Sequence, residues 1–225
     1  MQLILASASP RRRELLAQLG LPFEVLPAEI DESLPPGVSV AQAVAELARR
    51  KAHVAAARLG PATSGAAAPR PAIVIAADTL VVLDGRPFGK PLSRADARRM
   101  LSALRGRTHQ VVTAVAVVET ATGREDVEAV TSEVTMRQFE DAELERYLAT
   151  GESADKAGAY ALQGAGGRLV AAVEGSATNV IGLPLETLLC LLRRVGVAVS
   201  EPVPFEPPPG LRGPAASGPD SPAPR

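Results

Sequence analysis

The sequence predicts an α/β protein with a mixed β-sheet, and three observations favour this class. Short apolar runs that suit buried strands alternate with amphipathic helical segments in the first half of the chain. Two long strand-like segments, HQVVTAVAVVET and EDVEAVTSEVTMRQ, then follow each other, as in an antiparallel hairpin. A chain of 225 residues is long enough to bury one full core.

The first elements are recognised by the residues at their ends. QLILA (2–6) is expected to be a buried strand, and Pro10 to lie in the first turn of a helix that ends at Gly20. FEVLP (23–27) is expected to be a second short strand, and DESLPPG (31–37) a turn-rich loop.

A second helix and the central strand are expected next. Ser39 can cap a helix that runs to about Leu59, and PATSGAAAPRP (61–71) has the composition of a surface loop. AIVIAA (72–77) is a nearly continuous apolar run, typical of a central strand, and is expected to end at Asp78-Thr79. LVVLDGRPF then continues as a strand and an Asp-Gly turn.

The rest of the chain is expected to form the hairpin, further helices and one more strand. Besides the hairpin, these elements are SRADARRMLSALRG (93–106, a capped helix), FEDAELERYLAT (139–150, a helix), GRLVAAVEG (167–175, a strand) and PLETLLCLLRRVG (184–196, a helix). From Ser200 on, the chain is rich in Pro, Gly and Ala and has few large apolar residues. We therefore expect one ordered domain over 1–198 and a disordered tail over 199–225.

Composition excludes several kinds of partner. Hydrophobic residues make up 46% of the chain and charged residues 22%, which is ordinary for a soluble globular protein. Because the net charge is −1 and the pI about 6.2, no overall field favours nucleic acid or an anionic membrane. No segment resembles a signal peptide or approaches the roughly 20 apolar residues of a membrane span. We therefore expect a cytoplasmic protein.

Rare residue types are informative in this chain. The single cysteine, Cys190, excludes a disulfide scaffold and is expected to be a buried core thiol. Only three of the 24 basic residues are lysines, Lys51, Lys90 and Lys156, and Asn179 is the single asparagine. GC-rich coding alone can produce this bias, yet each of these four residues lies in a segment that looks like a site.

The turn SASPRRR, between the first strand and the first helix, has the features of an anion site. The hydroxyls of Ser7 and Ser9 and the free amides of a helix N-terminus can bind an anion, and Arg11, Arg12 and Arg13 add positive charge. Arginines at a helix start oppose the helix dipole, at about 0.3–1 kcal/mol each when exposed, and a bound phosphate would remove that conflict. The alternative is that these arginines are solvated surface charge.

Two carboxylates are candidates for metal binding or proton transfer. Asp78 follows a buried apolar run, where it could bind a metal or act as a general base, or simply cap the next segment as a turn residue. Glu32, in EIDES, could complete a metal site or be surface charge.

Three further segments carry candidate ligand-binding residues. FGKP presents Lys90 on a rigid turn, and EGSATNVIGLP carries Asn179. ESADKAGAYALQGAGG places Lys156 and Gln163 among glycines, whose backbone can approach phosphate closely. This Gly-rich stretch is weak evidence alone, because it matches neither the Walker A nor the dinucleotide-binding spacing.

The inventory of these segments fits phosphoanhydride chemistry. It combines cationic anion binders with carboxylates and has no His or Cys cluster, so its hard oxygen ligands favour Mg²⁺ or Mn²⁺ over Zn²⁺. His53 and His109 lie outside the motifs and are interpreted as structural.

Seven ordered segments together resemble the Maf family of nucleoside triphosphate pyrophosphatases, over about residues 2 to 196. They are LASASPRRRELL, EIDES, ARRKA, AADTLVVLDGRPFGKP, ADARRMLSALRGRTHQVVTAV, DKAGAYALQGAGG and GSATNVIGLP. The resemblance implies an elongated mixed sheet flanked by helices, the inosine-triphosphatase-like fold with a central substrate cleft, usually as a homodimer. It also implies hydrolysis of a nucleoside triphosphate to the monophosphate and pyrophosphate with a divalent cation (Mg²⁺, Mn²⁺ or Co²⁺).

Particular residues resemble the branch of the family that acts on dTTP and UTP. The branch that prefers 7-methyl-GTP typically has Trp after Ser-Pro, Ser-Asp-Gln at the strand end, and Glu where this chain has Gln163. By this resemblance Arg11, Thr79 and Gln163 would set the substrate preference, and Asp78 would be the proton acceptor. The Gln163 amide suits this role because it can both donate and accept a hydrogen bond at a pyrimidine edge.

The same resemblance suggests how a triphosphate and a metal would be held. The residues expected to hold the triphosphate are Ser7, Ser9, Arg12, Lys51, Lys90 and Lys156. Glu32 and Asp78 are expected to lie near the metal. Two alternatives stay open: a pyrophosphatase for 7-methyl-GTP or another non-canonical purine triphosphate, and a nucleotide-binding regulator of septum formation or cell division.

Overall fold

The computed structural model describes residues 1–33, 37–59 and 71–199. The expected loop 61–71, apart from Pro71, and the expected disordered tail beyond Val199 lie outside the described residues.

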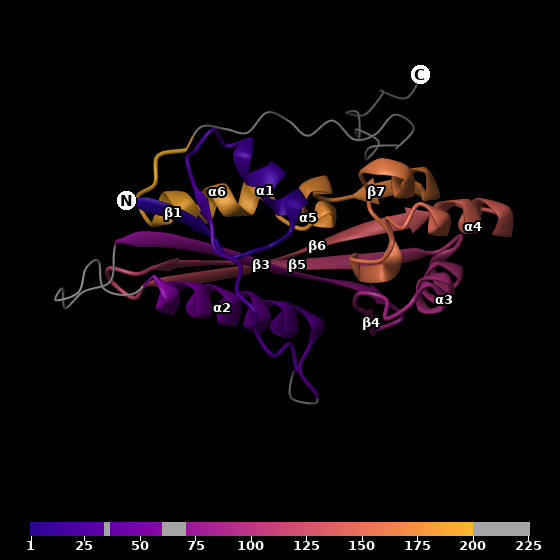
Figure 1. The fold of residues 1–225 in the computed structure, drawn as a ribbon, viewed down its shortest axis with the longest axis horizontal. Helices are drawn as coiled ribbons and strands as arrows, with labels where there is room; N and C mark the ends of the chain where they lie inside the picture. The colour runs from indigo at the N-terminus through magenta and orange to yellow at the C-terminus, as the bar shows by residue number, and fades with distance from the viewer. Residues whose placement is uncertain (34–36, 60–70, 200–225) are drawn as a thin grey trace, which may run out of the picture.

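These residues form one seven-stranded mixed sheet with helices on both faces (Figure 1), which confirms the expected α/β class. The strand order is β2-β1-β3-β5-β6-β7, and β4 pairs with the end of β3. β1 is parallel to β2 and β3, whereas the other pairs are antiparallel. The strands are β1 (Gln2–Leu5), β2 (Glu24–Val25), β3 (Ala72–Leu83), β4 (Arg86–Phe88), β5 (Thr108–Glu119), β6 (Glu125–Met136) and β7 (Val170–Glu174).

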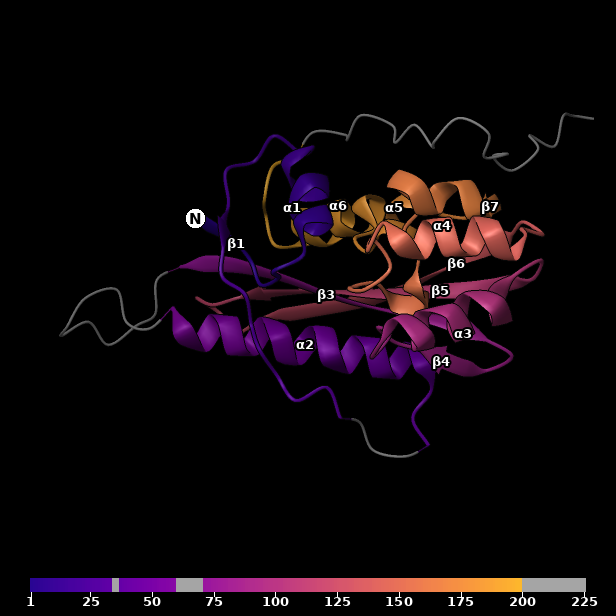
Figure 2. The ribbon, with the colours of Figure 1, turned by 45° about the vertical axis from the view of Figure 1, so that its right-hand side comes forward.

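The long helix α2 lies along one face of the sheet, and α1, α5 and α6 lie along the opposite face (Figures 1 and 2). The helices are α1 (Pro10–Ala17), α2 (Val40–Arg58), α3 (Arg94–Leu104), α4 (Asp141–Ala149), α5 (Ala177–Ile181) and α6 (Leu185–Arg194), with 3₁₀ turns η1 (Ala157–Ala159) and η2 (Gly164–Leu169). Ser39 forms a capping box with Gln42 at the start of α2, as its position in the sequence predicts.

The alternation of side chains along each strand divides the core into two. In β1, Leu3 and Leu5 point into the core shared with α1 and α6, whereas Ile4 points into the core under α2. β3 follows the same rule, with Ile75 on the first side and Val74 on the second. The strands buried on both faces are therefore apolar at nearly every position.

The interpretation that the central strand ends at Asp78-Thr79 is wrong. β3 runs unbroken from Ala72 to Leu83, and Asp78 and Thr79 pair with Ala114 and Thr113 of β5. The apolar pattern resumes in LVVL, and β5 is long enough to pair along almost the whole of β3, so two polar residues do not end the strand.

The other edge of β3 has two neighbours in succession. β1 pairs with β3 as far as Ile75, and β4 pairs with it from Val81 on. In the described part of the chain no strand pairs with this edge between those two positions. Asp78 and Thr79 therefore lie where the sheet is open on one side.

Two further expectations differ from the structure. The segment ATNVI, for which no helix was expected, forms the short helix α5, capped by Ser176. Its Thr, Asn and Val residues have low helix propensity, so the sequence carries little signal for it. The expectation that Cys190 is a buried thiol is wrong, because it is exposed on α6. The buried face of α6 is formed by leucines such as Leu188 and Leu192, and Cys190 falls on the other face.

Among the described residues, no helix combines the length and the apolar character needed to cross a membrane.

His109 belongs to the core, in agreement with its structural interpretation. It lies in β5 and is 3% exposed, and its Nε2 lies 2.8 Å from the Tyr160 hydroxyl oxygen. The two rings meet edge to face, 5.4 Å apart. Burial lowers the pKa of His109 from 6.5 to about 4, because the charged imidazolium loses its hydration.

This burial predicts a pH dependence of stability. Between pH 6.5 and 4 the unfolded chain binds a proton at this histidine that the folded chain does not bind, so the free energy of unfolding falls as the pH falls. The loss at the acid end of this window is about 3 kcal/mol. Urea denaturation of the wild type and of His109→Gln at several pH values measures it, with His53→Gln as the control. Equal pH dependence in wild type and His109→Gln would contradict the assignment.

Candidate active site

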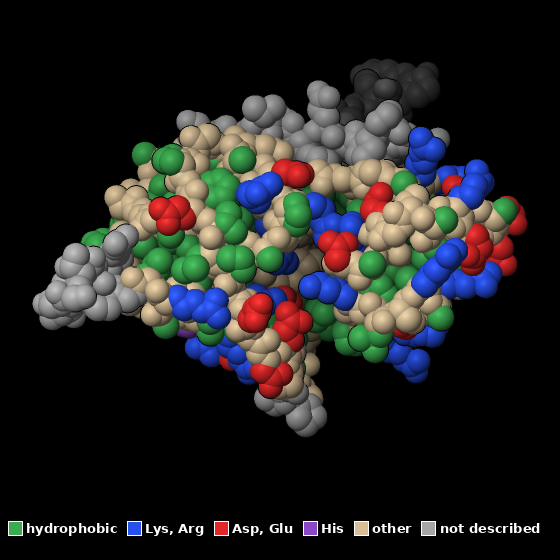
Figure 3. Space-filling model, viewed as in Figure 1, with side chains coloured by type: hydrophobic (Ala, Val, Ile, Leu, Met, Phe, Trp, Pro, Cys, Tyr) green, Lys and Arg blue, Asp and Glu red, His purple; other side chains and the backbone are tan. Residues whose placement is uncertain are grey.

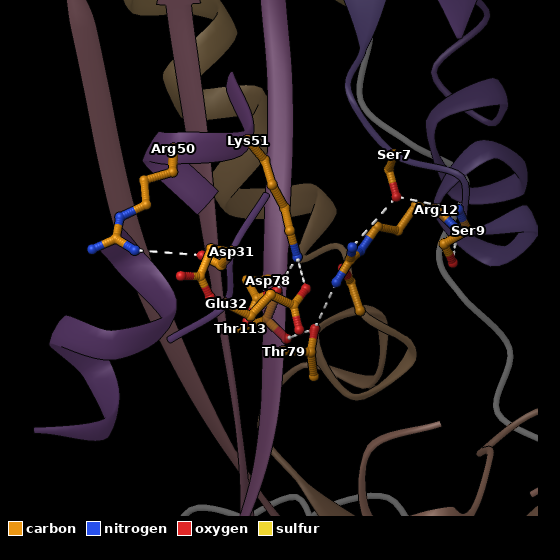
Figure 4. A network of polar contacts seen from close by, with 11 residues as sticks. Ser7, Ser9, Arg12, Asp31, Glu32, Arg50, Lys51, Asp78, Thr79 and Thr113 are labelled. Carbon is orange, nitrogen blue, oxygen red and sulfur yellow. Dashed lines mark hydrogen bonds and ion pairs between the residues drawn. The ribbon is translucent and has the colours of Figure 1, made fainter. Parts of the chain in front are cut away.

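A buried ion pair joins the middle of β3 to α2. The Asp78 side chain lies within the sheet and only 7% of the residue is exposed. Lys51, on α2, donates hydrogen bonds to Asp78 Oδ1 at 2.5 Å and to Glu32 Oε1 at 2.8 Å (Figure 4). A carboxylate without a partner would be costly at this depth, and the ammonium group compensates its charge. Three expected site residues from separate segments therefore meet at one point.

Glu32 reaches this point from the loop before α2. Arg50 holds the loop by donating to the backbone oxygens of Asp31, at 3.5 Å, and Ser33, at 3.0 Å. The hydrogen bond from Lys51 is the largest cause that lowers the pKa of Glu32, followed by the opposing effect of burial and the charges of Lys51, Lys90 and Arg12. Arg50 carries no signal in the sequence that separates it from other surface arginines.

Arg12 approaches from the opposite face of the sheet and makes three side-chain hydrogen bonds. It donates from Nε to the Gly182 backbone oxygen at 2.8 Å, from Nη1 to Ser7 Oγ at 3.4 Å, and from Nη2 to Thr79 Oγ1 at 3.1 Å. Burial lowers the pKa of Arg12, and the charge of Asp78 opposes this effect. Ser9 is the N-cap of α1 and accepts from the Arg12 amide at 3.5 Å.

The hydrogen bonds continue from Thr79 into the core. Thr79 Oγ1 lies 2.9 Å from Thr113 Oγ1, and Thr113 donates to the Asn179 backbone oxygen at 3.0 Å. The Asn179 side chain donates to the Val111 backbone oxygen at 3.0 Å and to Ser132 Oγ at 2.8 Å. The single asparagine is therefore a buried structural residue that joins α5 to β5 and β6. Thr113 was not among the expected site residues, and its one signal is a hydroxyl in the apolar run VVTAVAVV.

The Gly-rich segment lies beside the Lys90 turn, since the Gly158 amide donates to the Gly89 backbone oxygen at 3.0 Å. Lys156 pairs with Asp155 at 2.6 Å. Burial disfavours ionisation of Asp155, but the hydrogen bond and charge of Lys156, together with the charge of Arg11, outweigh it and lower the pKa. Arg11, Asp155 and Lys156 thus form a second charged group. Among the described residues, no hydrogen bond links this group to Asp78.

Two backbone amides after Gln163 are bonded within the protein. Glu152 accepts hydrogen bonds from the amides of Ala165 at 3.0 Å and Gly166 at 3.1 Å, so its carboxylate holds the start of η2. Gln163 is the N-cap residue of η2, and its side chain makes no cap hydrogen bond there. Glu152 therefore positions the segment that presents Gln163.

The oxygen atoms at Asp78 and Glu32 fit a divalent cation. Both carboxylates already converge on one positively charged atom, Lys51 Nζ. Mg²⁺ typically uses only one or two protein carboxylates and completes its coordination with water and substrate phosphate.

The surface is hollowed near the middle of the face seen in Figure 3, where acidic and basic side chains gather around the depression. A separate groove of about 530 Å³ lies between α2 and the start of β6, lined by Val38, Gln42, Ala45, Glu46, Arg49, Arg50, Glu125 and Val127. Because Asp78, Lys51 and Arg12 do not line that groove, we place the candidate site at the polar cluster instead.

The role of Glu152 is testable through stability. Glu152→Ala leaves two amides without their acceptor, and we expect a loss of about 1–3 kcal/mol in the free energy of unfolding. Glu140→Ala is the control, because Glu140 is the N-cap residue of α4 but its side chain makes no cap hydrogen bond, so the substitution should change stability by less than about 0.5 kcal/mol. Equal effects of the two substitutions in urea denaturation would refute the role of Glu152.

Several known proteins are similar to this chain. A "dTTP/UTP pyrophosphatase" of Moorella thermoacetica is 50% identical over 88% of this chain and 97% of its own length. Proteins of the same name from Anaeromyxobacter dehalogenans and Myxococcus xanthus are each 48% identical, over 92% and 87% of this chain and 98% and 93% of their own lengths. The Staphylococcus aureus Ham1 structure is 18% identical with a TM-score of 0.42, over 61% of this chain and 73% of that one, too low to support a conclusion.

A family model described as "Maf-like protein" matches residues 2–195, which is nearly all of the described chain. With relatives at 48–50% identity over most of its length, the chain belongs to the Maf family.

Proposed function

We propose that this protein is a nucleoside triphosphate pyrophosphatase that hydrolyses dTTP and UTP to the monophosphate and pyrophosphate. The names of its relatives support the reaction and the substrates. One observation carries the proposal: two carboxylates that can share a cation lie next to a half-buried arginine, at the open edge of β3. A phosphate at this edge can meet both groups, although they approach from opposite faces of the sheet.

The triphosphate is bound by donors that the fold leaves available. Arg12 uses three of its five N–H groups within the described chain, so one remains on each terminal nitrogen for phosphate oxygens. Ser7 Oγ accepts from Arg12 and from the Ser9 amide, which leaves its own proton for an acceptor. Lys51, Lys90 and Lys156 add positive charge.

Asp78 accepts the proton of the attacking water. The water oxygen attacks the α-phosphorus, the bond from that phosphorus to the bridging oxygen breaks, and pyrophosphate leaves. Lys51 bonds to Asp78 Oδ1, so we assign the water to Oδ2. A divalent cation bound at Asp78 and Glu32 would supply charge neutralisation for the triphosphate and the leaving group. Positioning and electrostatics then account for most of the acceleration.

Three further properties belong to the same proposal. Arg11, Thr79 and Gln163 set the preference among bases, the protein acts in the cytoplasm, and it forms a homodimer. The roles of the three side chains are supported by the resemblance to the dTTP and UTP branch, the homodimer by the resemblance to the family, and the location by the composition of the chain.

The base is tested by Asp78→Asn. We expect kcat for dTTP to fall about 10³-fold, since the amide cannot accept the proton, while the fold is retained because Lys51 keeps Glu32 as a partner. Pyrophosphate release and far-ultraviolet circular dichroism measure the two effects. Asp84→Asn, at the turn after the same strand, is the control and should leave kcat unchanged. An Asp78→Asn enzyme within tenfold of wild type would remove Asp78 from this role.

Substrate preference is tested by Gln163→Glu. An ionised glutamate only accepts hydrogen bonds, so it loses the donor that a pyrimidine oxygen requires. We expect kcat/KM for dTTP and UTP to fall at least about tenfold relative to 7-methyl-GTP. The assay compares dTTP, UTP, CTP, 7-methyl-GTP and ITP with Mg²⁺, Mn²⁺ and Co²⁺. Gln18→Glu, on the exposed end of α1, is the control. An unchanged preference would exclude Gln163 as a selector.

A further inference from the structure

The backbone carbonyl of Asn179 determines which group donates and which accepts in the hydrogen bonds that lead to Thr79. The Asn179 backbone oxygen can only accept, so Thr113 must donate its hydroxyl proton to it, at 3.0 Å. Thr113 Oγ1 is then the acceptor for Thr79, 2.9 Å away. Because the Thr79 proton is used in this way, Thr79 offers only lone pairs to Nη2 of Arg12, at 3.1 Å (Figure 4).

The end of this chain of bonds is rigid. Thr113 is fully buried in β5, and the Asn179 residue is anchored by its side-chain bonds to Val111 and Ser132. The Gly182 amide also donates to the Asn179 backbone oxygen, at 2.9 Å, and the Gly182 oxygen accepts from Arg12 Nε. The same short helix, α5, therefore holds Arg12 directly and, through two threonines, indirectly.

We propose that Thr113 is a positioning residue for Arg12. Thr113 accepts the hydrogen bond from the Thr79 hydroxyl, so that Thr79 can only accept a hydrogen bond from Arg12. This fixes the orientation of the guanidinium group so that its two remaining N–H groups face the triphosphate. Thr79 orients Arg12 with one lone pair, and its part in base preference is that of an acceptor only, because its proton is already used. That the ligand is a triphosphate rests on the proposed function, whereas the link between Thr113 and Arg12 does not.

The substitution Thr113→Val removes the acceptor and keeps the shape of the side chain. The Asn179 oxygen still has the Gly182 amide, so the loss falls on Thr79, whose proton can then turn toward Arg12. We expect KM for dTTP to rise about tenfold, as for a weakened hydrogen bond to a charged group. We expect kcat to stay within about twofold, because a side chain such as Arg12 that binds substrate and transition state equally well affects KM alone. Thr113→Ser restores the hydroxyl and should restore KM.

A purely structural role is excluded by a double-mutant cycle. In an Arg12→Ala background, Thr113→Val should change KM no further, because its effect passes through Arg12. The matched control is Thr108→Val, which breaks the exposed Thr108–Thr135 hydroxyl pair at the start of the same strand and should not change KM. Additive effects in the cycle, a fall in kcat at unchanged KM, or failure of Thr113→Ser to rescue would each overturn the proposal.

A binding measurement separates this inference from the proposed function. Calorimetric titration with inorganic tripolyphosphate repeats the cycle without hydrolysis of a nucleotide, and Thr113→Val should raise Kd by the same factor as KM. If wild-type protein released no pyrophosphate from dTTP, the proposed function would fail, and the tripolyphosphate cycle would still decide whether Thr113 acts through Arg12. Equal Kd for wild type and Thr113→Val would overturn the inference.

Discussion

The ammonium group of Lys51 compensates the charge of Asp78 in the middle of a seven-stranded sheet. An unpaired charge at a position that is only 7% exposed would destabilise the fold. Lys51 supplies the opposite charge from α2 and binds Glu32 from the preceding loop with the same atom. The geometry of the site therefore depends on how α2 packs against β3, and the site cannot form before the two have docked.

The strand β3 explains why one site can use both faces of a sheet. Neighbouring residues of a strand point to opposite faces, so Asp78 faces α2 and Thr79 faces α1 and α5, where Arg12 lies. In a sheet paired on both edges these faces would be separated by backbone. Here β1 ends beside Ile75 and β4 begins beside Val81, and the open edge between them lets one ligand contact both sides.

Local sequence signals predict most helices and strands, but they do not predict features that depend on residues far along the chain. The Ser39 cap, the hairpin and the amphipathic helices each depend on residues close in sequence, and the structure confirms them. The unbroken course of β3 through Asp78 depends on β5, which lies more than thirty positions away, so no local pattern reports it. The prediction that Cys190 is buried is wrong for a related reason. Its neighbours in the sequence are apolar, but the helical periodicity places Cys190 on the exposed face of α6.

The candidate site divides along the same line. Charged residues of the site can be recognised in the sequence, because they stand beside apolar runs, in turns or at helix starts. These are Arg12, Glu32, Lys51 and Asp78. Thr113, Arg50 and Glu152 act by orienting a neighbour, through bonds to a backbone oxygen or amide that any residue could provide. Glu152 accepts hydrogen bonds from the amides of Ala165 and Gly166, and the Ser9 hydroxyl caps α1, so these groups are already bonded within the described site. The directions of the charged side chains depend on contacts with residues far along the chain, such as those of Arg12 with Thr79 and of Lys51 with Asp78, and no local pattern in the sequence reports them.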